Sequence, residues 1–188
     1  MSIPEPLQVL TTHTDMLGMQ EPRPETAASL EQLRIAGRTM RSIVDMLVDI
    51  TRLETGDIPR DIRVFPVSLL LEELRKQHTL PATEKNLSFR VNNCDRHVRS
   101  DYNLLRLILQ NLISNAIRYT DSGTIEVNCI ARDDMLRIAV TDTGIGIPDT
   151  ERQMIFEEFY QIDNPHRDRQ QGLGLGLAIV KRLTHLLD

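Results

Sequence analysis

The chain has 188 residues, a formal net charge of −5, 40% hydrophobic residues and 26% charged residues. This length fits one ordinary domain or two small ones, and this balance is that of a soluble globular protein. The acidic charge argues against a nucleic-acid partner, and the lack of an apolar run of about 18 residues or a signal peptide argues against direct membrane contact by this chain.

Two helices are predicted at the start of the chain, at residues 3–19 and 25–55, separated by the two prolines of "QEPRPET". In the second, apolar residues recur three and four positions apart and form a seam of period 3.5. The seam consists of Leu33, Ala36, Met40, Ile43, Leu47 and Ile50. A second copy would bury this seam in a four-helix bundle, so we expect a homodimer; the alternative is packing against the rest of the same chain.

A domain boundary is predicted in "ETGDIPRD", because Gly56 and Pro59 follow the helix there. Residues 1–57 would form the helical-hairpin dimerisation domain and residues 58–188 a second domain. In the second domain we expect helices at 67–78, at 102–118 and from about Leu175 onward. Strands are expected at 87–91 and 97–100, with a hairpin of 123–130 and 135–142. This order predicts an α+β sandwich with helices on one face of a mixed sheet.

Two cysteines, Cys94 and Cys129, are too few and too unpatterned to indicate a disulfide framework or a zinc site. We therefore expect reduced thiols and a cytoplasmic location, while a longer parent protein could still be anchored in a membrane. The five histidines are expected to be surface or packing residues: His13, His78, His97, His166 and His185.

Two amides, Asn111 and Asn115, lie four positions apart in the apolar stretch "NLISNAIRYT". On a helix they share a face, and on a buried face each amide needs a polar partner. One interpretation is two amides that serve only local structure. The other is a ligand that contacts this face.

Two glycine runs follow. In "DTGIGIP", Asp142 ends a predicted strand, and Gly144 and Gly146 allow the backbone to turn sharply and approach a flat ligand, while the carboxylate can accept from an exocyclic amine. In "GLGLGLAIV", alternate glycines precede a helix whose free N–H groups favour phosphate. Each run alone is equally compatible with a flexible loop. Neither fits a Rossmann unit or a P-loop, since the strand context and a Gly-Lys-Ser/Thr are missing.

Taken in order, the Asn helix, "DTGIGIP", "IFEEFYQ" and "GLGLGLAIVKRL" resemble the ATP-binding domain of sensor histidine kinases, a Bergerat-type fold shared with gyrase-type topoisomerases. The stretch "MLVDITRLETGD" is similar to the end of the dimerisation and phosphotransfer hairpin of the same kinases. The stretch "FEEFYQIDNPHRDRQQGLGLGLAIV" is especially similar to the kinase portion of hybrid sensor kinases. The resemblance covers nearly the whole chain.

This resemblance implies a magnesium ion and ATP as cofactors, with Asn115 as the metal ligand. Asn111 would stand where hydrolytic members of the fold carry a glutamate, which implies phosphoryl transfer, because an amide cannot act as a general base. Arg118, where the kinases usually have lysine, and Tyr119 would reach the nucleotide. Asp142 would bind the adenine amino group above Gly144 and Gly146.

The second glycine run would hold the phosphates through Gly172, Gly174, Leu175 and Gly176. The segment up to Gln171 would be a mobile lid. Ordinary packing is the expected role of Phe156 and Phe159 in that lid. A solvated position is expected for Arg167 and Arg169.

The pattern fails at both ends of the chain. Counting back from Pro6-Leu7 puts Met1 in the slot of the phosphoacceptor histidine, so the chain has no recognisable acceptor. A fragment that begins just past the histidine and a relative that has lost it both explain this. The strands that complete the sheet in these kinases are also missing after "THLLD", from which we expect marginal stability or weakened nucleotide affinity.

Three functions compete. The first is the core of a two-component histidine kinase, which passes phosphate from ATP to a histidine and onward to an aspartate of a response-regulator receiver domain. The second is a degenerate kinase that dimerises or binds a regulator without catalysis. The third is a free-standing ATPase, which Asn111 disfavours.

Overall fold

The computed structural model describes residue 37 and residues 60–133, 135–162 and 174–187. The described ranges from residue 60 onward belong to a compact unit, Arg60–Asp188. The two predicted N-terminal helices, their seam and the predicted boundary at residues 57 and 58 lie outside the described residues. They remain predictions.

Two sheets are present in the described part. In the larger, β4 (Thr124–Arg132) lies between β2 (Ser88–Val91), which runs parallel to it, and β5 (Met135–Asp142), which runs antiparallel. In the smaller, β1 (Ile62–Pro66) pairs antiparallel with β3 (His97–Asp101). The mixed sheet that the sequence predicts is therefore confirmed.

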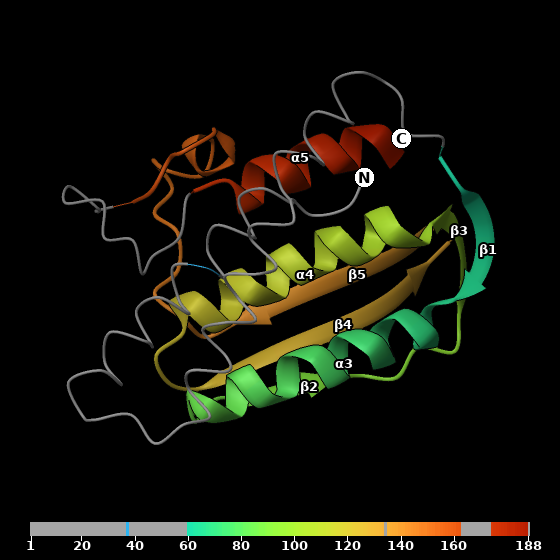
Figure 1. Ribbon diagram of the computed structural model, residues 1–188, viewed down its shortest axis with the longest axis horizontal. Coiled ribbons are helices and arrows are strands. Elements are labelled where there is room, and N and C mark those ends of the chain that lie inside the picture. The colour runs from blue at the N-terminus through green and yellow to red at the C-terminus, as the bar shows by residue number, and fades with distance from the viewer. Residues whose placement is uncertain (1–36, 38–59, 134, 163–173, 188) are drawn as a thin grey trace. The chain divides into compact units, whose positions relative to one another are not determined.

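Helices α3 (Val67–Glu84) and α4 (Tyr102–Tyr119) run along the larger sheet, and α5 (Gly176–Leu187) lies beside α4 (Figure 1). Leu74 of α3, Ile113 of α4 and Ile125 and Val127 of β4 are fully buried in one apolar core. Side chains alternate between the faces of a strand, so Glu126 points away from this core, where it pairs with Arg90 at 3.6 Å. One face of β4 is thus apolar and covered, and the other is polar.

The ends of α4 are fixed by their neighbours in the sequence. Asp101 caps the start, accepting from the backbone N–H groups of Asn103 at 2.9 Å and Leu104 at 3.1 Å. Its second oxygen accepts from the N–H of Asp61 at 2.9 Å, which ties the chain before β1 to the helix. At the other end the backbone becomes extended at Thr120, so the helix stops there.

Helix α3 extends beyond the predicted end at residue 78, although Pro81 lies inside it. It closes in a Schellman arrangement: the N–H of Leu87 bonds to the carbonyl of Ala82 at 2.9 Å, and that of Asn86 to the carbonyl of Thr83 at 2.9 Å. Asn86 takes the left-handed conformation that this closure requires, with φ of 57°. The stop signal was therefore an asparagine eight residues beyond the predicted end.

Cys94 and Cys129 form a disulfide, which corrects the expectation of two reduced thiols. Cys94 lies in the segment between β2 and β3, and Cys129 lies on β4. The register of β2 beside β4 brings the two cysteines together, with 5.9 Å between their Cα atoms. This proximity arises from parallel pairing between distant segments, which cysteine spacing in the sequence does not indicate.

His78 is a packing residue on the buried side of α3, 5% exposed, with its ring edge-on to Phe89.

Burial lowers the pKa of His78 below its usual 6.5. The unfolded chain therefore takes up a proton at this histidine more readily than the folded protein does. As a result, the free energy of unfolding should fall as the pH drops below about 6.5. We expect His78→Leu to reduce this acid sensitivity, measured by urea unfolding at pH 7.5 and pH 5.5. The exposed His97→Gln is the matched control, and an equal loss of stability at acid pH in both variants would contradict the prediction.

Candidate functional site

The two amides of α4 are half-buried, which corrects the expectation that they lie on a buried face. Asn111 Nδ2 donates to the carbonyl of Leu107 at 2.9 Å, so this amide group is satisfied by its own helix. The local interpretation therefore holds for the nitrogen of Asn111. The remaining polar atoms of the pair face the start of α5.

Gly176, the first residue of α5, lies against both amides. A Cβ built on Gly176 would be 3.1 Å from Asn111 Oδ1 and 3.5 and 3.7 Å from the amide atoms of Asn115. The structure thus brings Asn111, Asn115 and Gly176 together, as the resemblance implies. The free N–H groups and positive end of a helix stand beside two amide side chains, an arrangement suited to an anion and its counterion.

A second cluster forms where β5 ends. Asp142 Oδ1 accepts from the N–H of Gly144 at 2.9 Å, which bends the chain into a turn. A Cβ on Gly144 would lie 2.3 Å from the carbonyl oxygen of Tyr119 and 2.9 Å from Thr120 Oγ1, so only glycine fits. The N–H of Ile145 donates to the same Tyr119 carbonyl at 3.2 Å. The loop after Asp142 is therefore seated directly on the end of α4.

Gly146 has a different requirement. Its φ is +70°, and no heavy atom lies within 4 Å of the place a Cβ would take. The position needs glycine for its backbone conformation, and the space beside it is open. Asp142, Arg118 and Tyr119 are likewise solvent-exposed, so all of them are accessible to a ligand.

In the second glycine run, Gly174 and Leu175 make packing contacts within the protein. A Cβ on Gly174, whose φ is +69°, would lie 2.6 Å from the carbonyl oxygen of Tyr160, and the Gly174 carbonyl accepts from the N–H of Phe159 at 3.1 Å. Gly174 therefore serves close contact with the preceding segment. Leu175 is 5% exposed, so its side chain belongs to the core and leaves only its backbone for a ligand. Gly172 lies outside the described residues.

The segment expected to act as a lid begins with a short 3-10 helix, η1 (Met154–Phe156). Phe156 is half-buried, but Phe159 is 67% exposed and has φ of 62°, so the expectation of ordinary packing is wrong for Phe159. Ion pairs join this segment to α5, one of them Lys181 to Glu157 at 3.3 Å and the other Arg182 to Glu158. Arg167, Arg169 and Gln171 lie outside the described residues.

A magnesium ion fits the donors that are present. Within the described ranges, no group of three His, Cys, Asp or Glu side chains could hold a metal ion. Magnesium bound to a nucleotide takes its ligands chiefly from phosphate oxygens and water, with one or two from the protein. The half-buried Asn115, whose amide faces the start of α5, matches that demand.

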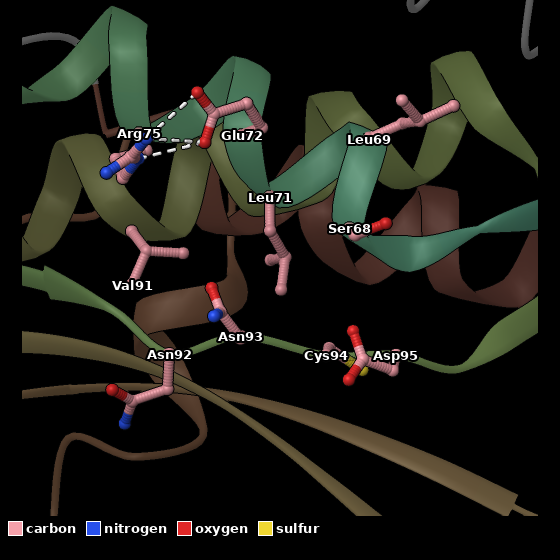
Figure 2. Close-up of a pocket in the computed structure, with 10 residues that line it drawn as sticks. All are labelled: Ser68, Leu69, Leu71, Glu72, Arg75, Val91, Asn92, Asn93, Cys94 and Asp95. Atoms are coloured by element: carbon pink, nitrogen blue, oxygen red, sulfur yellow. Dashed lines mark hydrogen bonds and ion pairs between the residues drawn. The ribbon is translucent and has the colours of Figure 1, made fainter.

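A cavity of about 380 Å³ lies elsewhere, between residues 68–75 of α3 and residues 91–95 (Figure 2). The ion pair of Arg75 with Glu72, with a shortest separation of 2.7 Å, forms part of its rim, and Cys94 lies on the opposite wall. No residue of the α4 clusters lines it. This cavity was not expected from the sequence.

Thr120 is a site residue that sequence reasoning missed. Its side chain is fully buried, and its hydroxyl has no hydrogen-bond partner among the residues that the structure describes. It ends α4 directly beneath Gly144. A threonine immediately after a helix is the only signal in the sequence, and it points to a helix end more readily than to a site.

Comparison with known proteins agrees with this geometry. Residues 100–188 match the family model of the histidine kinase-, DNA gyrase B- and HSP90-like ATPases. The circadian input-output histidine kinase CikA of Synechococcus elongatus is 32% identical over 162 residues, which are 84% of this chain and 22% of that protein. The aerobic respiration control sensor protein ArcB of Escherichia coli is 32% identical over 160 residues, 82% of this chain and 21% of ArcB.

Among solved structures, full-length ShkA in complex with AMPPNP superposes with a TM-score of 0.74 at 28% identity, covering 96% of this chain and 38% of that one. The chain spans less than a third of the length of CikA and ArcB. No helix in the described ranges is both long and apolar enough to cross a membrane. Together the matches support an α+β, Bergerat-type ATP-binding domain of the histidine kinase kind.

Proposed function

We propose that this chain is the kinase core of a two-component sensor histidine kinase, which binds Mg-ATP against the C-terminal half of α4. One observation carries the proposal: two segments contact this half of the helix and its end. The start of α5 lies against Asn111 and Asn115, and the loop after Asp142 lies against Tyr119 and Thr120. A nucleotide has two chemically different ends, and these two clusters match them.

At one cluster, the Asp142 carboxylate would bind the adenine. Its Oδ1 already accepts from Gly144, which leaves Oδ2 to accept from an exocyclic amine. Gly144 and Gly146 have no side chains, so the flat ring could approach the backbone closely at these positions. Arg118 and Tyr119, both exposed at the end of α4, would contact the nucleotide from the side.

At the other cluster, the N–H groups at the start of α5 would bind the phosphates, with Gly176 leaving room beside the amides of α4. Asn115 would offer its amide oxygen to magnesium, which when bound neutralises phosphate charge. Asn111 carries no group that could deprotonate water, and this favours transfer to another side chain over hydrolysis. Gly172, Gly174 and Leu175 would contribute through their backbones.

The finer parts of the proposal concern the whole protein. Phosphate would pass to a histidine that is absent from this chain and then to an aspartate of a receiver domain. Residues 1–57 would form the dimerising hairpin and residues 58–188 the ATP-binding domain, in the cytoplasm. The names of CikA and ArcB, a histidine kinase and a sensor protein, support this assignment.

A degenerate module that dimerises or binds a regulator without catalysis is the second candidate. Incubation with labelled ATP and a separate hairpin that carries the histidine separates the two. Label on the hairpin supports the kinase. Bound nucleotide without any transferred label supports the degenerate module instead.

We expect Asn115→Ala to weaken binding of Mg-ATP about threefold to tenfold, the effect of losing one neutral polar contact. Because the amide would act through the metal, affinity for ATP in EDTA should hardly change. Isothermal titration calorimetry with and without magnesium measures both values. The exposed neighbour Ser114→Ala serves as the control, and an equal loss of affinity in EDTA would argue against a metal ligand.

A further inference from the structure

The carbonyls at the end of α4 accept hydrogen bonds from two other segments of the chain. The last four carbonyls of an α-helix have no partner within the helix. In α4 the carbonyl of Tyr119 accepts from the N–H of Ile145 at 3.2 Å, on the side of the loop that follows Asp142. From the end of α3, the ammonium of Lys85 donates to the carbonyls of Ile117 and Arg118, each at 3.0 Å.

Lys85 reaches this place because of how α3 ends. It is the C-cap residue of α3, and the Schellman closure through Asn86 fixes its backbone. Its ammonium also lies 3.4 Å from the carbonyl of Thr120, the first residue beyond α4. One cation therefore contacts three carbonyls around the end of α4, and the carbonyl of Tyr119, which lies between them in the sequence, accepts from the loop instead.

We propose that Lys85 is a positioning residue for nucleotide binding, which fixes the end of α4 so that Tyr119 can anchor the loop of Asp142, Gly144 and Ile145. The inference rests on the proposed function, since it deepens the role of that site. Lys85 does not touch the nucleotide. Its effect passes through the Tyr119 carbonyl, which accepts from Ile145 and closely limits Gly144.

Electrostatics supports the arrangement. The C-terminal end of a helix carries about half a negative charge, and a cation there is stabilising. Lys85 comes from another element, so the same contacts also join α3 to α4 at the edge of the site. Arg118 is an exposed second cation in the last turn of α4.

The test compares Lys85→Met, which removes the ammonium and keeps the aliphatic chain, with Lys76→Met on the same helix. Lys76 is exposed and pairs with Glu72 at 3.6 Å, away from α4. In the full chain, amide hydrogen exchange of Ile145 should become about two- to fivefold faster in Lys85→Met. Exchange of Thr143, whose N–H bonds to Thr124 of the sheet at 3.1 Å, should stay unchanged. Lys85→Arg retains a cation that can donate to carbonyls and should keep Ile145 protected.

Calorimetry with Mg-ATP gives the functional readout, and Lys85→Met should bind about two- to fivefold more weakly than Lys76→Met. Unchanged Ile145 exchange in Lys85→Met overturns the proposal, as does faster Ile145 exchange with full nucleotide affinity. Faster exchange of Thr143 and Ile145 alike would indicate general destabilisation and also overturn it. If the unaltered chain binds no Mg-ATP, the proposed function fails, while the exchange of Ile145 still decides whether Lys85 positions the loop.

Discussion

Replacing Gly144 with alanine is expected to destabilise the domain by about 2 kcal/mol and to abolish measurable Mg-ATP binding. The new methyl group would lie 2.3 Å from the backbone oxygen of Tyr119, and a backbone atom at a helix end cannot rotate away as a side chain can. Overpacking at such a place costs about 1–3 kcal/mol, because the loop or the helix end must shift. Urea unfolding and calorimetry measure the two effects.

Gly146→Ala is the matched control, two residues further along the same loop. A methyl group there meets no atom within 4 Å, and the cost is only the strain of φ at +70°, about 1 kcal/mol. We therefore expect the Gly144 variant to lose clearly more stability than the Gly146 variant. Equal losses in both would mean that the contact with Tyr119 does not limit this position.

Asp142→Ala is expected to weaken Mg-ATP binding about 10- to 100-fold, the usual effect of removing a charged hydrogen-bond partner. The carboxylate has two tasks in our proposal, to hold the turn through Gly144 and to bind the amine of adenine. Asp142→Asn keeps an oxygen for the first task and loses the charge, so it should bind ATP with intermediate affinity. Calorimetry across the three proteins gives this order.

The control for charge is Asp149→Ala in the same loop region. Asp149 is highly exposed, and it pairs with Arg152 at 2.7 Å. Its loss should leave affinity for Mg-ATP within about twofold, because exposed ion pairs contribute little. A similar loss of affinity in Asp142→Ala and Asp149→Ala would show that net charge, and not a specific contact, governs binding.

The sequence predicted those helices and strands whose pattern of apolar residues is complete within the element itself. Helix α4 has apolar residues at helical spacing, and the β4–β5 hairpin has two alternating strands, so the predicted bounds agree with the structure nearly to the residue. Strand β1 was missed. It is five residues long, ends in a proline and is defined by its partner β3, which lies over thirty residues further on.

The same distinction applies to the site. Asp142, Gly144 and Gly146 can be singled out from the sequence because the turn chemistry lies within one short segment. The position of Gly176 against the two amides of α4 depends on how α5 packs on α4. Only the family resemblance implied it. Lys85 and Thr120 had no local signal that pointed to the site. A lysine or a threonine after a helix is ordinary in sequence, and only the tertiary structure brings these two helix ends together.

The parallel pairing of β2 with β4 has a consequence for the order of folding. The β4–β5 hairpin joins neighbouring segments and can form early. The pairing of Ser88 with Thr124, in contrast, closes a long loop of chain that contains β3 and α4. Closing such a long loop slows folding, because its entropy is lost before any contact compensates for it. The last strand to join the larger sheet should be β2, and with it the segment that carries Cys94.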